Sequence, residues 1–288
     1  MKEILIPICN ILKLNVSSCS LDVATGGDIN KSYYFQTPDN NYFLKTNKAE
    51  HFHMFAAEFD ALEEIRKQRC IRTPKPLLHG NTRHFSYLVI EHITLETLVD
   101  YRKFGFQLAS MHRIKKDYFG WHQDNTIGTT LQRNTREDDW ATFWRKHRLE
   151  AQIELAIKDH RDNLLIDQLL ELAGICDTFF VNRNVEKSLL HGDLWSGNYA
   201  ADDHNEPVIY DPASYYGDHE TDLAMLELFG QPPPEFYESY QDVLKIDQDF
   251  QTRKVLYNLY HMLNHLHLFG DQYLSTVKHM TSSLLAES

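Results

Sequence analysis

Residues 190–211 are the part of the chain best suited to chemistry, because they contain two carboxylates and one amide at spacings that an enzyme can use. Asp193 belongs to a His191-Gly192-Asp193 tripeptide, and Asn198 follows it five residues later. Kinases use an Asp and an Asn at this spacing to accept a hydroxyl proton and to hold Mg²⁺. Asp211 closes an apolar run further along and supplies a second carboxylate for a metal. The pattern predicts phosphoryl transfer from ATP with Mg²⁺.

Phosphoryl transfer also needs groups that hold and neutralise phosphates, and the first sixty residues contain such groups in order. Gly26 and Gly27, with Asn30 close behind, lie between strand patterns, where backbone N–H groups can approach phosphate. Lys45 follows on the next strand pattern, and Glu58 on a helix pattern can orient it through an ion pair. Taken singly, a hairpin turn, a solvated Lys and a helix-surface Glu are ordinary alternatives. Their order along the chain favours an ATP site.

Two further groups of residues are expected to frame this site. The strand pattern over residues 88–93 leads into Glu91, His92 and Ile93, where main-chain groups of a hinge can hydrogen-bond adenine. Asp222 begins a helix pattern. It either braces the catalytic loop, with His191 as a second support, or only stabilises the helix N-terminus by its charge. The sequence leaves these two interpretations of Asp222 open.

Composition excludes several classes of partner. The 288 residues contain 29 Lys and Arg against 41 Asp and Glu, a formal net charge of −12 that repels nucleic acid and anionic lipid. No run of about 18 apolar residues is present to span a bilayer. The four cysteines have no C-x-x-C spacing, so they are expected to be reduced thiols. We therefore predict a cytoplasmic enzyme without nucleic acid or membrane partners.

Hydrophobic periodicity changes near Ile93. Before it, short strand patterns over residues 31–36, 42–44 and 85–90 surround one amphipathic helix that begins near residue 51. After it, helix patterns dominate, and short strands are expected at 188–190 and 207–211. The helices are expected at 97–113, 138–158, 162–181, 219–229 and 250–269. This order predicts an α+β fold of two lobes, an antiparallel sheet lobe with one helix over residues 1–93 and a larger, mostly helical lobe over 94–288.

Three histidines on one predicted helix, His261, His265 and His267, invite a metal interpretation. The first two share a helix face. No cysteine or carboxylate partner spacing accompanies them, so we favour surface or core histidines over ligands.

Several segments together resemble the fructosamine kinase family, also called ketosamine 3-kinases, within the aminoglycoside phosphotransferase and choline kinase-like group. The similarity covers nearly the whole chain. It is carried by residues 26–30, 119–128, 211–213 and 216–225, and by the form of the catalytic loop that contains Trp195. The resemblance implies a protein kinase-like fold and ATP-dependent phosphorylation of the 3-hydroxyl of a ketoamine, the adduct of a sugar with an amine or a protein lysine. It also implies that the unstable 3-phosphate decomposes and frees the amine, which is deglycation.

By position, the resemblance implies that Asp193 is the base, that Asn198 and Asp211 are the Mg²⁺ ligands, and that Lys45 binds phosphate. Trp195 would stack on the sugar or its amine-bearing arm, with a structural role as an equal alternative. Asp124 and Asn125 would contact the ketoamine. Some members of the family have a Cys in the phosphate loop that links dimers. This chain has Asp28 there, so no such switch is expected.

Other functions stay open at this point. The catalytic loop is His-Gly-Asp and lacks the Arg that binds the activation-loop phosphate in many protein kinases. The segment after Asp211 is also short, and both features favour a small-molecule kinase. The acceptor can instead be an aminoglycoside, choline or homoserine, and a catalytically silent kinase-fold binding module is a third possibility. The sequence names neither the sugar nor the source organism, nor any regulation. It does not separate free from protein-bound adducts, or a monomer from a weak homodimer.

Overall fold

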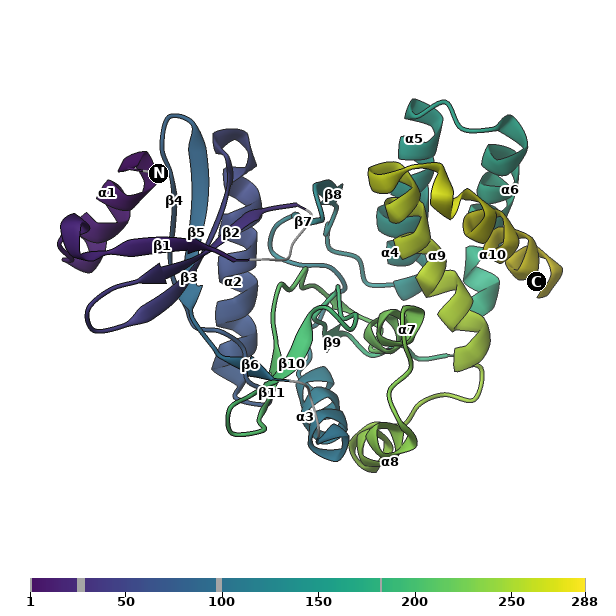
Figure 1. Ribbon diagram of the computed structural model, residues 1–288. Helices are drawn as coiled ribbons and strands as arrows, with labels where there is room; N and C mark the ends of the chain where they lie inside the picture. The colour runs from purple at the N-terminus through teal and green to yellow at the C-terminus, as the bar shows by residue number, and fades with distance from the viewer. Residues whose placement is uncertain (1, 25–28, 97–99, 182, 288) are drawn as a thin grey trace.

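The computed structural model describes residues 2–24, 29–96, 100–181 and 183–287 and consists of a sheet lobe and a helical lobe (Figure 1). The sheet lobe contains a five-stranded antiparallel sheet in the order β1-β2-β3-β5-β4. Its strands are β1 (Ser20–Val23), β2 (Lys31–Gln36), β3 (Asn41–Lys48), β4 (Pro76–Asn81) and β5 (Phe85–Glu91). The strand patterns predicted for this lobe are therefore confirmed, and β1 and β4 are added to them.

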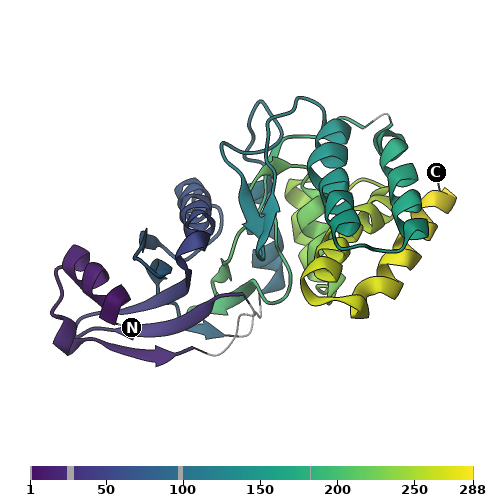
Figure 2. The ribbon, with the colours of Figure 1, turned by 90° about the horizontal axis from the view of Figure 1, so that it is seen from above.

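Helices cover both faces of this sheet. The predicted helix is α2 (Phe52–Gln68), whose Phe55 and Leu62 pack on Leu88. A second helix, α1 (Lys2–Leu12), covers the other face through Ile4 and Ile8. Figure 1 shows the strands between the two helices, and Figure 2 shows the sheet lobe beside the helical lobe from above.

The expectation of a single helix in this lobe was therefore wrong. Pro7 lies inside α1, and a proline in a helix interior normally costs about 3 kcal/mol. Burial of Ile4 and Ile8, one helical turn apart on the sheet side, offsets that cost.

The register of β3 determines where its side chains point. Leu44 belongs to the core under α1, whereas the neighbouring Phe43 packs in the core under α2. Because side chains alternate along a strand, Lys45 shares the α2 face with Phe43. Lys45 pairs with Ser32 on β2 and Leu88 on β5, so the middle of the sheet carries this cation toward α2.

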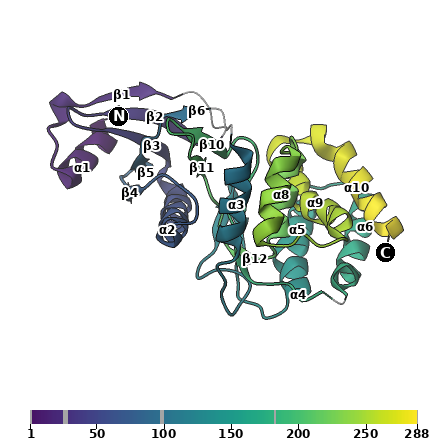
Figure 3. The same cartoon turned by 90° about the horizontal axis from the view of Figure 1, so that it is seen from below.

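The helical lobe has a large core built from helices that are distant in sequence. The helix predicted at 138–158 consists of α4 (Trp140–Trp144), a π-helical turn (Arg145–Leu149) and α5 (Glu150–Lys158). The other predicted helices are α3 (Tyr101–His112), α6 (Asn163–Gly174), α7 (Glu220–Leu228) and α9 (Phe250–Phe269). Two helices were not predicted, α8 (Pro234–Val243) and α10 (Leu274–Glu287). Figure 3 shows α8 beside α3.

Short strands connect the lobes and frame the loops that follow. After β5, the chain continues into β6 (Leu95–Glu96), which pairs with β10 (Tyr199–Asp202), and β10 pairs with β11 (Pro207–Ile209). Two smaller pairs are β9 (Ser188–Leu189) with β12 (Tyr216–Gly217), and β7 (Asn125–Ile127) with β8 (Thr130–Gln132). Ile93 lies in the connection between β5 and β6, and the domain division at this residue stays a prediction. Within the described ranges, no helix is long and apolar enough to cross a bilayer.

Candidate active site

A cleft of about 1080 Å³ is lined by residues of both lobes. It brings together segments that are far apart in sequence: β3, α2, the β5–β6 connection, the catalytic loop and the end of α9. The predicted site residues that line it are Asn30, Lys45, Glu58, Glu91, His92, Ile93, Asn125, Asp193, Trp195, Asn198 and Asp211. His191 and Asp222 lie behind this lining, and Gly26 and Gly27 lie outside the described residues.

Lys45 connects the two lobes through its side chain. Its Nζ donates to Glu58 Oε1 (2.6 Å) and also contacts Asp211. Burial alone would lower the pKa of this amine, but the carboxylates of Asp211 and Glu58 outweigh burial and raise it. Lys45 is therefore a fixed positive charge, and the side chain of Asp211 remains 45% exposed toward the cleft.

Asp193 and Asn198 form the reactive edge of the catalytic loop. Asn198 Nδ2 donates to the backbone oxygen of Asp193 (2.8 Å) and to its Oδ2 (3.2 Å). Burial, together with the nearby charge of Asp211, raises the pKa of Asp193 to about 7. A carboxyl group with this pKa can accept a proton near neutral pH.

His191 and Gly192 give the loop its shape. The N–H of Asp193 donates to His191 Nδ1 (3.2 Å), and His191 Nε2 donates to the carbonyl of Tyr210 (2.9 Å). One ring nitrogen accepts and the other donates, so the imidazole is neutral, in agreement with a pKa lowered by burial. Gly192 has φ +83°, and a Cβ there would lie 2.2 Å from Ala213 O. A side chain at this position would break the loop.

Asp222 holds the catalytic loop from below. Its Oδ2 accepts the N–H of His191 (2.7 Å), and its Oδ1 accepts the N–H of Gly192 (2.8 Å). His112 Nε2 also contacts Oδ2 (3.1 Å), and Tyr240 Oη lies 2.7 Å from His112 Nδ1. Burial would raise the pKa of Asp222, but the hydrogen bond from His112 and the loop N–H groups lower it. Asp222 therefore braces the loop, rather than acting only as an N-terminal helix charge.

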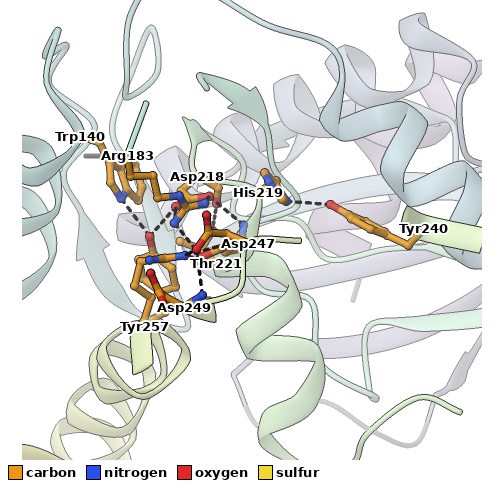
Figure 4. Close-up of polar contacts among 11 residues, drawn as sticks. Trp140, Arg183, Asp218, His219, Thr221, Tyr240, Asp247, Asp249 and Tyr257 are labelled. Carbon is orange, nitrogen blue, oxygen red and sulfur yellow. Dashed lines mark hydrogen bonds and ion pairs between the residues drawn. The ribbon is translucent and has the colours of Figure 1, made fainter. Parts of the chain in front are cut away.

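The segment between Asp211 and Asp222 is itself anchored by polar contacts. Asp218 is fully buried and accepts hydrogen bonds from Arg183 and from Tyr257 Oη (2.6 Å). Trp140 Nε1 in turn donates to Tyr257 Oη (3.1 Å), as Figure 4 shows. Contacts of this kind hold in place the part of the chain where protein kinases carry a mobile activation segment.

The predicted hinge residues Glu91, His92 and Ile93 all line the cleft. The Glu91 carboxylate already has protein partners, because it accepts hydrogen bonds from Arg72 (3.0 Å) and from the N–H of Lys75 (3.0 Å). The His92 ring packs edge-on against Tyr34, with centroids 5.4 Å apart. The N–H of Glu91 itself donates to the carbonyl of Lys75 (2.8 Å), so a contact with adenine would use the remaining main-chain groups of residues 91–93, and this role stays a prediction.

Two predicted acceptor contacts have other partners. Asp124 is not part of the cleft lining, and its Oδ1 accepts the N–H of Asn134 (2.7 Å). Asn125 lines the cleft but is 3% exposed, and it donates to Ser214 O (2.9 Å) while accepting from Gln132 Nε2 (2.8 Å). These contacts build the hairpin beside the cleft, so the geometry lends no support to direct contact between Asp124 and an acceptor.

Trp195 instead begins a row of aromatic side chains along the cleft. Its ring is 38% exposed and lies edge-on to Phe229, with centroids 5.9 Å apart. Phe229 neighbours His265 (5.6 Å), which neighbours Phe269 and Tyr273 (5.5 and 5.1 Å). We call these five residues the aromatic wall. Its last three members come from α9 and the turn after it, and only the three-dimensional structure brings them to Trp195.

The polar side chains around the cleft differ in whether they have hydrogen-bond partners. Asn264 is 3% exposed, and its Oδ1 has no hydrogen-bond partner among the described residues. On the far side, Asn30 accepts from Asn47 Nδ2 (2.8 Å) at the start of β2. Of the histidines of α9, His265 contacts the carbonyl of His261 (2.7 Å) and His267 contacts Asp159 (2.6 Å). The His261 ring packs edge-on against Tyr260, with centroids 5.1 Å apart.

The oxygen atoms at the catalytic loop fit a hard divalent cation. Asn198 uses its Nδ2 for Asp193, which leaves the amide oxygen for another ligand. Asp211 offers a half-exposed carboxylate beside it. Amide and carboxylate oxygens are the donors that Mg²⁺ takes from proteins, with nucleotide phosphates completing the shell.

The architecture is a protein kinase-like fold of the kind that phosphotransferases have. Solved structures have the same fold. A crystal structure from Haemophilus somnus 129PT, described as that of a fructosamine-3-kinase, superposes with a TM-score of 0.88 at 24% identity, covering 99% of this chain and 97% of that chain. The choline kinase LicA from Streptococcus pneumoniae has a TM-score of 0.66 at 14% identity, covering 99% and 98%. At such identities the likeness concerns the fold alone, and it confirms the predicted fold class.

Sequence comparison specifies the family. The family model described as fructosamine kinase matches residues 11–287. The chain is 40% identical over 268 residues to a "Probable ketoamine kinase" of Synechocystis sp., covering 91% of this chain and 88% of that protein. It is 39% identical over 257 residues to a chloroplastic protein-ribulosamine 3-kinase of Arabidopsis thaliana, covering 87% and 78%. The chain belongs to the fructosamine kinase family and is an ATP-dependent phosphotransferase.

Proposed function

We propose that this enzyme transfers the γ-phosphoryl group of ATP to the 3-hydroxyl of a ketoamine, a sugar joined through its ketose form to an amine. The single observation that carries the proposal is the position of Asp193, which lines one cleft together with Lys45 on one side and the aromatic wall on the other. Relatives of 39–40% identity named as ketoamine and ribulosamine kinases support the same acceptor class.

The residues take the following roles in this proposal. Asp193 accepts the proton of the acceptor hydroxyl, because its raised pKa matches neutral pH. Lys45, oriented by Glu58, binds the phosphates and offsets their charge. The main chain of residues 91–93 holds adenine, and Asn30 with Gly26 and Gly27 belongs to the phosphate loop.

Asn198 and Asp211 would hold Mg²⁺, which supplies charge neutralisation for the phosphates when it is bound. The contact of Asp211 with Lys45 keeps its carboxylate at the phosphate end of the cleft. The hydrogen bond from Asn198 to Asp193 turns the proton acceptor toward the same end.

The aromatic wall explains why the acceptor carries an amine. A ketoamine nitrogen is cationic at neutral pH, and cations bind favourably over the faces of Trp, Tyr and Phe. Trp195 lies two residues from Asp193 and is partly exposed, so a sugar at Asp193 places its amine-bearing arm along the wall. Phosphorylation at the 3-position yields a product that decomposes and frees the amine, which makes deglycation of small amines or protein lysines the outcome.

A substrate panel tests this function. Ribulose, fructose and erythrulose adducts of lysine are offered with Mg·ATP, and ADP formation is measured beside kanamycin, choline and homoserine as alternative acceptors. The proposal expects turnover of at least one lysine adduct at a kcat/KM well above that of every alternative acceptor. Turnover of an alternative acceptor with none of the adducts would refute it.

A further inference from the structure

Residues 119–125 belong to the segment 119–128, one of the sequence features that carry the family resemblance, and they contact helix α2 of the sheet lobe mainly at Glu64. Trp121 Nε1 donates to Glu64 Oε2 (2.6 Å), and Tyr216 Oη donates to Glu64 Oε1 (2.7 Å). Trp121 and Tyr216 are 2% and 1% exposed. Each oxygen of one α2 side chain thus has its own donor from the helical lobe. We call these three residues the Glu64 junction.

Backbone hydrogen bonds within the helical lobe hold both donors in place, independently of Glu64. The N–H of Gly120 donates to the carbonyl of Tyr216 (2.9 Å), and the N–H of Tyr216 donates to that of Gly120 (2.8 Å). The N–H of Trp121 donates to the carbonyl of Asn134 (2.9 Å). Gly120 has φ +101°, and a Cβ there would lie 2.5 Å from Asn134 O. The backbone geometry that presents the two donors therefore requires glycine.

A second pair of contacts lies beside the junction. Gln123 Nε2 donates to Asp60 Oδ2 (2.8 Å), and His122 Nε2 lies 3.6 Å from the same oxygen. These atoms are more exposed than the junction, so their contribution is small. Together the contacts attach the second half of α2 to the helical lobe.

The same helix carries Glu58, which holds Lys45. Glu58 and Glu64 lie six residues apart on α2, about 9 Å along the helix axis at 1.5 Å per residue. An unbroken helix transmits the position of one to the other. Tyr216, the second donor, lies five residues after Asp211, the other carboxylate on Lys45. The junction therefore ties the helix that orients Lys45 to the segment that carries Asp211.

We infer that Glu64 is a positioning residue for phosphoryl transfer: through Trp121 and Tyr216 it sets the place of α2, and so the place of the Lys45–Glu58 pair relative to Asp211. The inference rests on the proposed role of Lys45 in holding phosphate. It assigns to segment 119–125 a connection between the lobes in place of the acceptor contact expected from the sequence.

A double-mutant cycle tests the inference in the full-length enzyme. Glu64→Ala should lower kcat about tenfold or more, since small displacements of catalytic groups are costly, while KM for the acceptor stays within about twofold. In a Glu58→Gln background the same change should lower kcat less than about twofold, because the pair through which Glu64 acts is already broken. Trp121→Phe keeps an aromatic ring and removes one donor to Glu64, so it should reproduce part of the loss in kcat.

Glu63→Ala is the matched control. Glu63 neighbours Glu64 on α2 but pairs with Arg66 of the same helix (3.0 Å), so kcat should not change. A purely structural role for Glu64 would give losses that add to those of Glu58→Gln, and that result would overturn the inference. So would full kcat in both Glu64→Ala and Trp121→Phe. If Glu58→Gln itself retains full kcat, the proposed role of the Lys45 pair fails instead, which separates the two proposals.

Discussion

The two sides of the cleft are built on different principles. On the charged side, Lys45 is 4% exposed and contacts Glu58 of the sheet lobe and Asp211 of the helical lobe. On the aromatic side, Trp195, Phe229 and Phe269 line the cleft and are 38–46% exposed. The charged side presents groups with fixed partners, and the aromatic side presents partly exposed rings.

This difference separates the part of the reaction that all kinases share from the part that selects an acceptor. Phosphate always carries the same charge, so a preorganised cation serves any acceptor. Ring faces bind by shape and by the charge of the acceptor, so they can differ between related enzymes. Changes on the first side should therefore act on kcat for every acceptor, and changes on the second on the KM of the acceptor alone.

The largest effect is expected on the charged side. Lys45→Met removes the cation between Glu58 and Asp211, and kcat should fall about 10²-fold or more for any accepted substrate, as for loss of an electrostatic group in a preorganised site. Steady-state kinetics with Mg·ATP measure it.

Lys48→Met is the control for this variant, because Lys48 lies at the end of the same strand and its side chain is 78% exposed. It should keep the kcat of the unchanged enzyme. Equal losses in the two variants would remove the distinction between the charged side and the rest of β3.

A smaller effect is expected on the aromatic side. Trp195→Ala should raise KM for a lysine ketoamine about tenfold, the loss of one cation–π contact of about 1–2 kcal/mol, and leave KM for ATP unchanged. Phe106→Ala, an exposed aromatic on α3 (55% exposed), should change neither constant. An equal rise of both KM values in Trp195→Ala would show that the wall is not specific to the acceptor.

The sequence indicated which residues of the charged side lie together, but not which rings form the aromatic side, for a physical reason. Asp193 and Asn198 are close in sequence, so their spacing alone carries the signal, and the predicted pair of Lys45 and Glu58 forms a hydrogen bond in the structure. The aromatic wall joins Trp195 to His265 and Phe269 of α9, which are far from it in the sequence. The local pattern of that helix does not indicate this contact.

The Glu64 junction could not be predicted from the sequence for the same reason. Glu64 meets donors 57 and 152 residues away, and α2 carries several acidic residues with equal local claims to a partner. The helix α1 escaped prediction because Pro7 is a strong local signal against a helix, whereas the sheet face that stabilises α1 is assembled from distant strands.

The smallest effect concerns the stability of the enzyme without Mg²⁺ and nucleotide. The pKa of Asp193 is about 7 in the folded protein against about 3.9 in an unfolded chain. Because the folded state disfavours the ionised carboxylate, the free energy of unfolding falls as pH rises from about 4 to about 7. Asp193→Asn removes this penalty, so its Tm should exceed that of the unchanged enzyme by about 2–4 °C at pH 8 and by less near pH 4.5. Thermal unfolding at the two pH values measures it, and a lower Tm at pH 8 would contradict the raised pKa.

The turnover of that same variant tests the central claim most directly. With Mg·ATP and a lysine ketoamine accepted by the unchanged enzyme, Asp193→Asn should lose about 10²- to 10⁴-fold in kcat, the usual contribution of a general base. Asp203→Asn, on the exposed turn between β10 and β11, should keep full activity. A kcat of Asp193→Asn within about threefold of the unchanged enzyme would contradict the assignment of Asp193 as the group that accepts the proton of the acceptor hydroxyl.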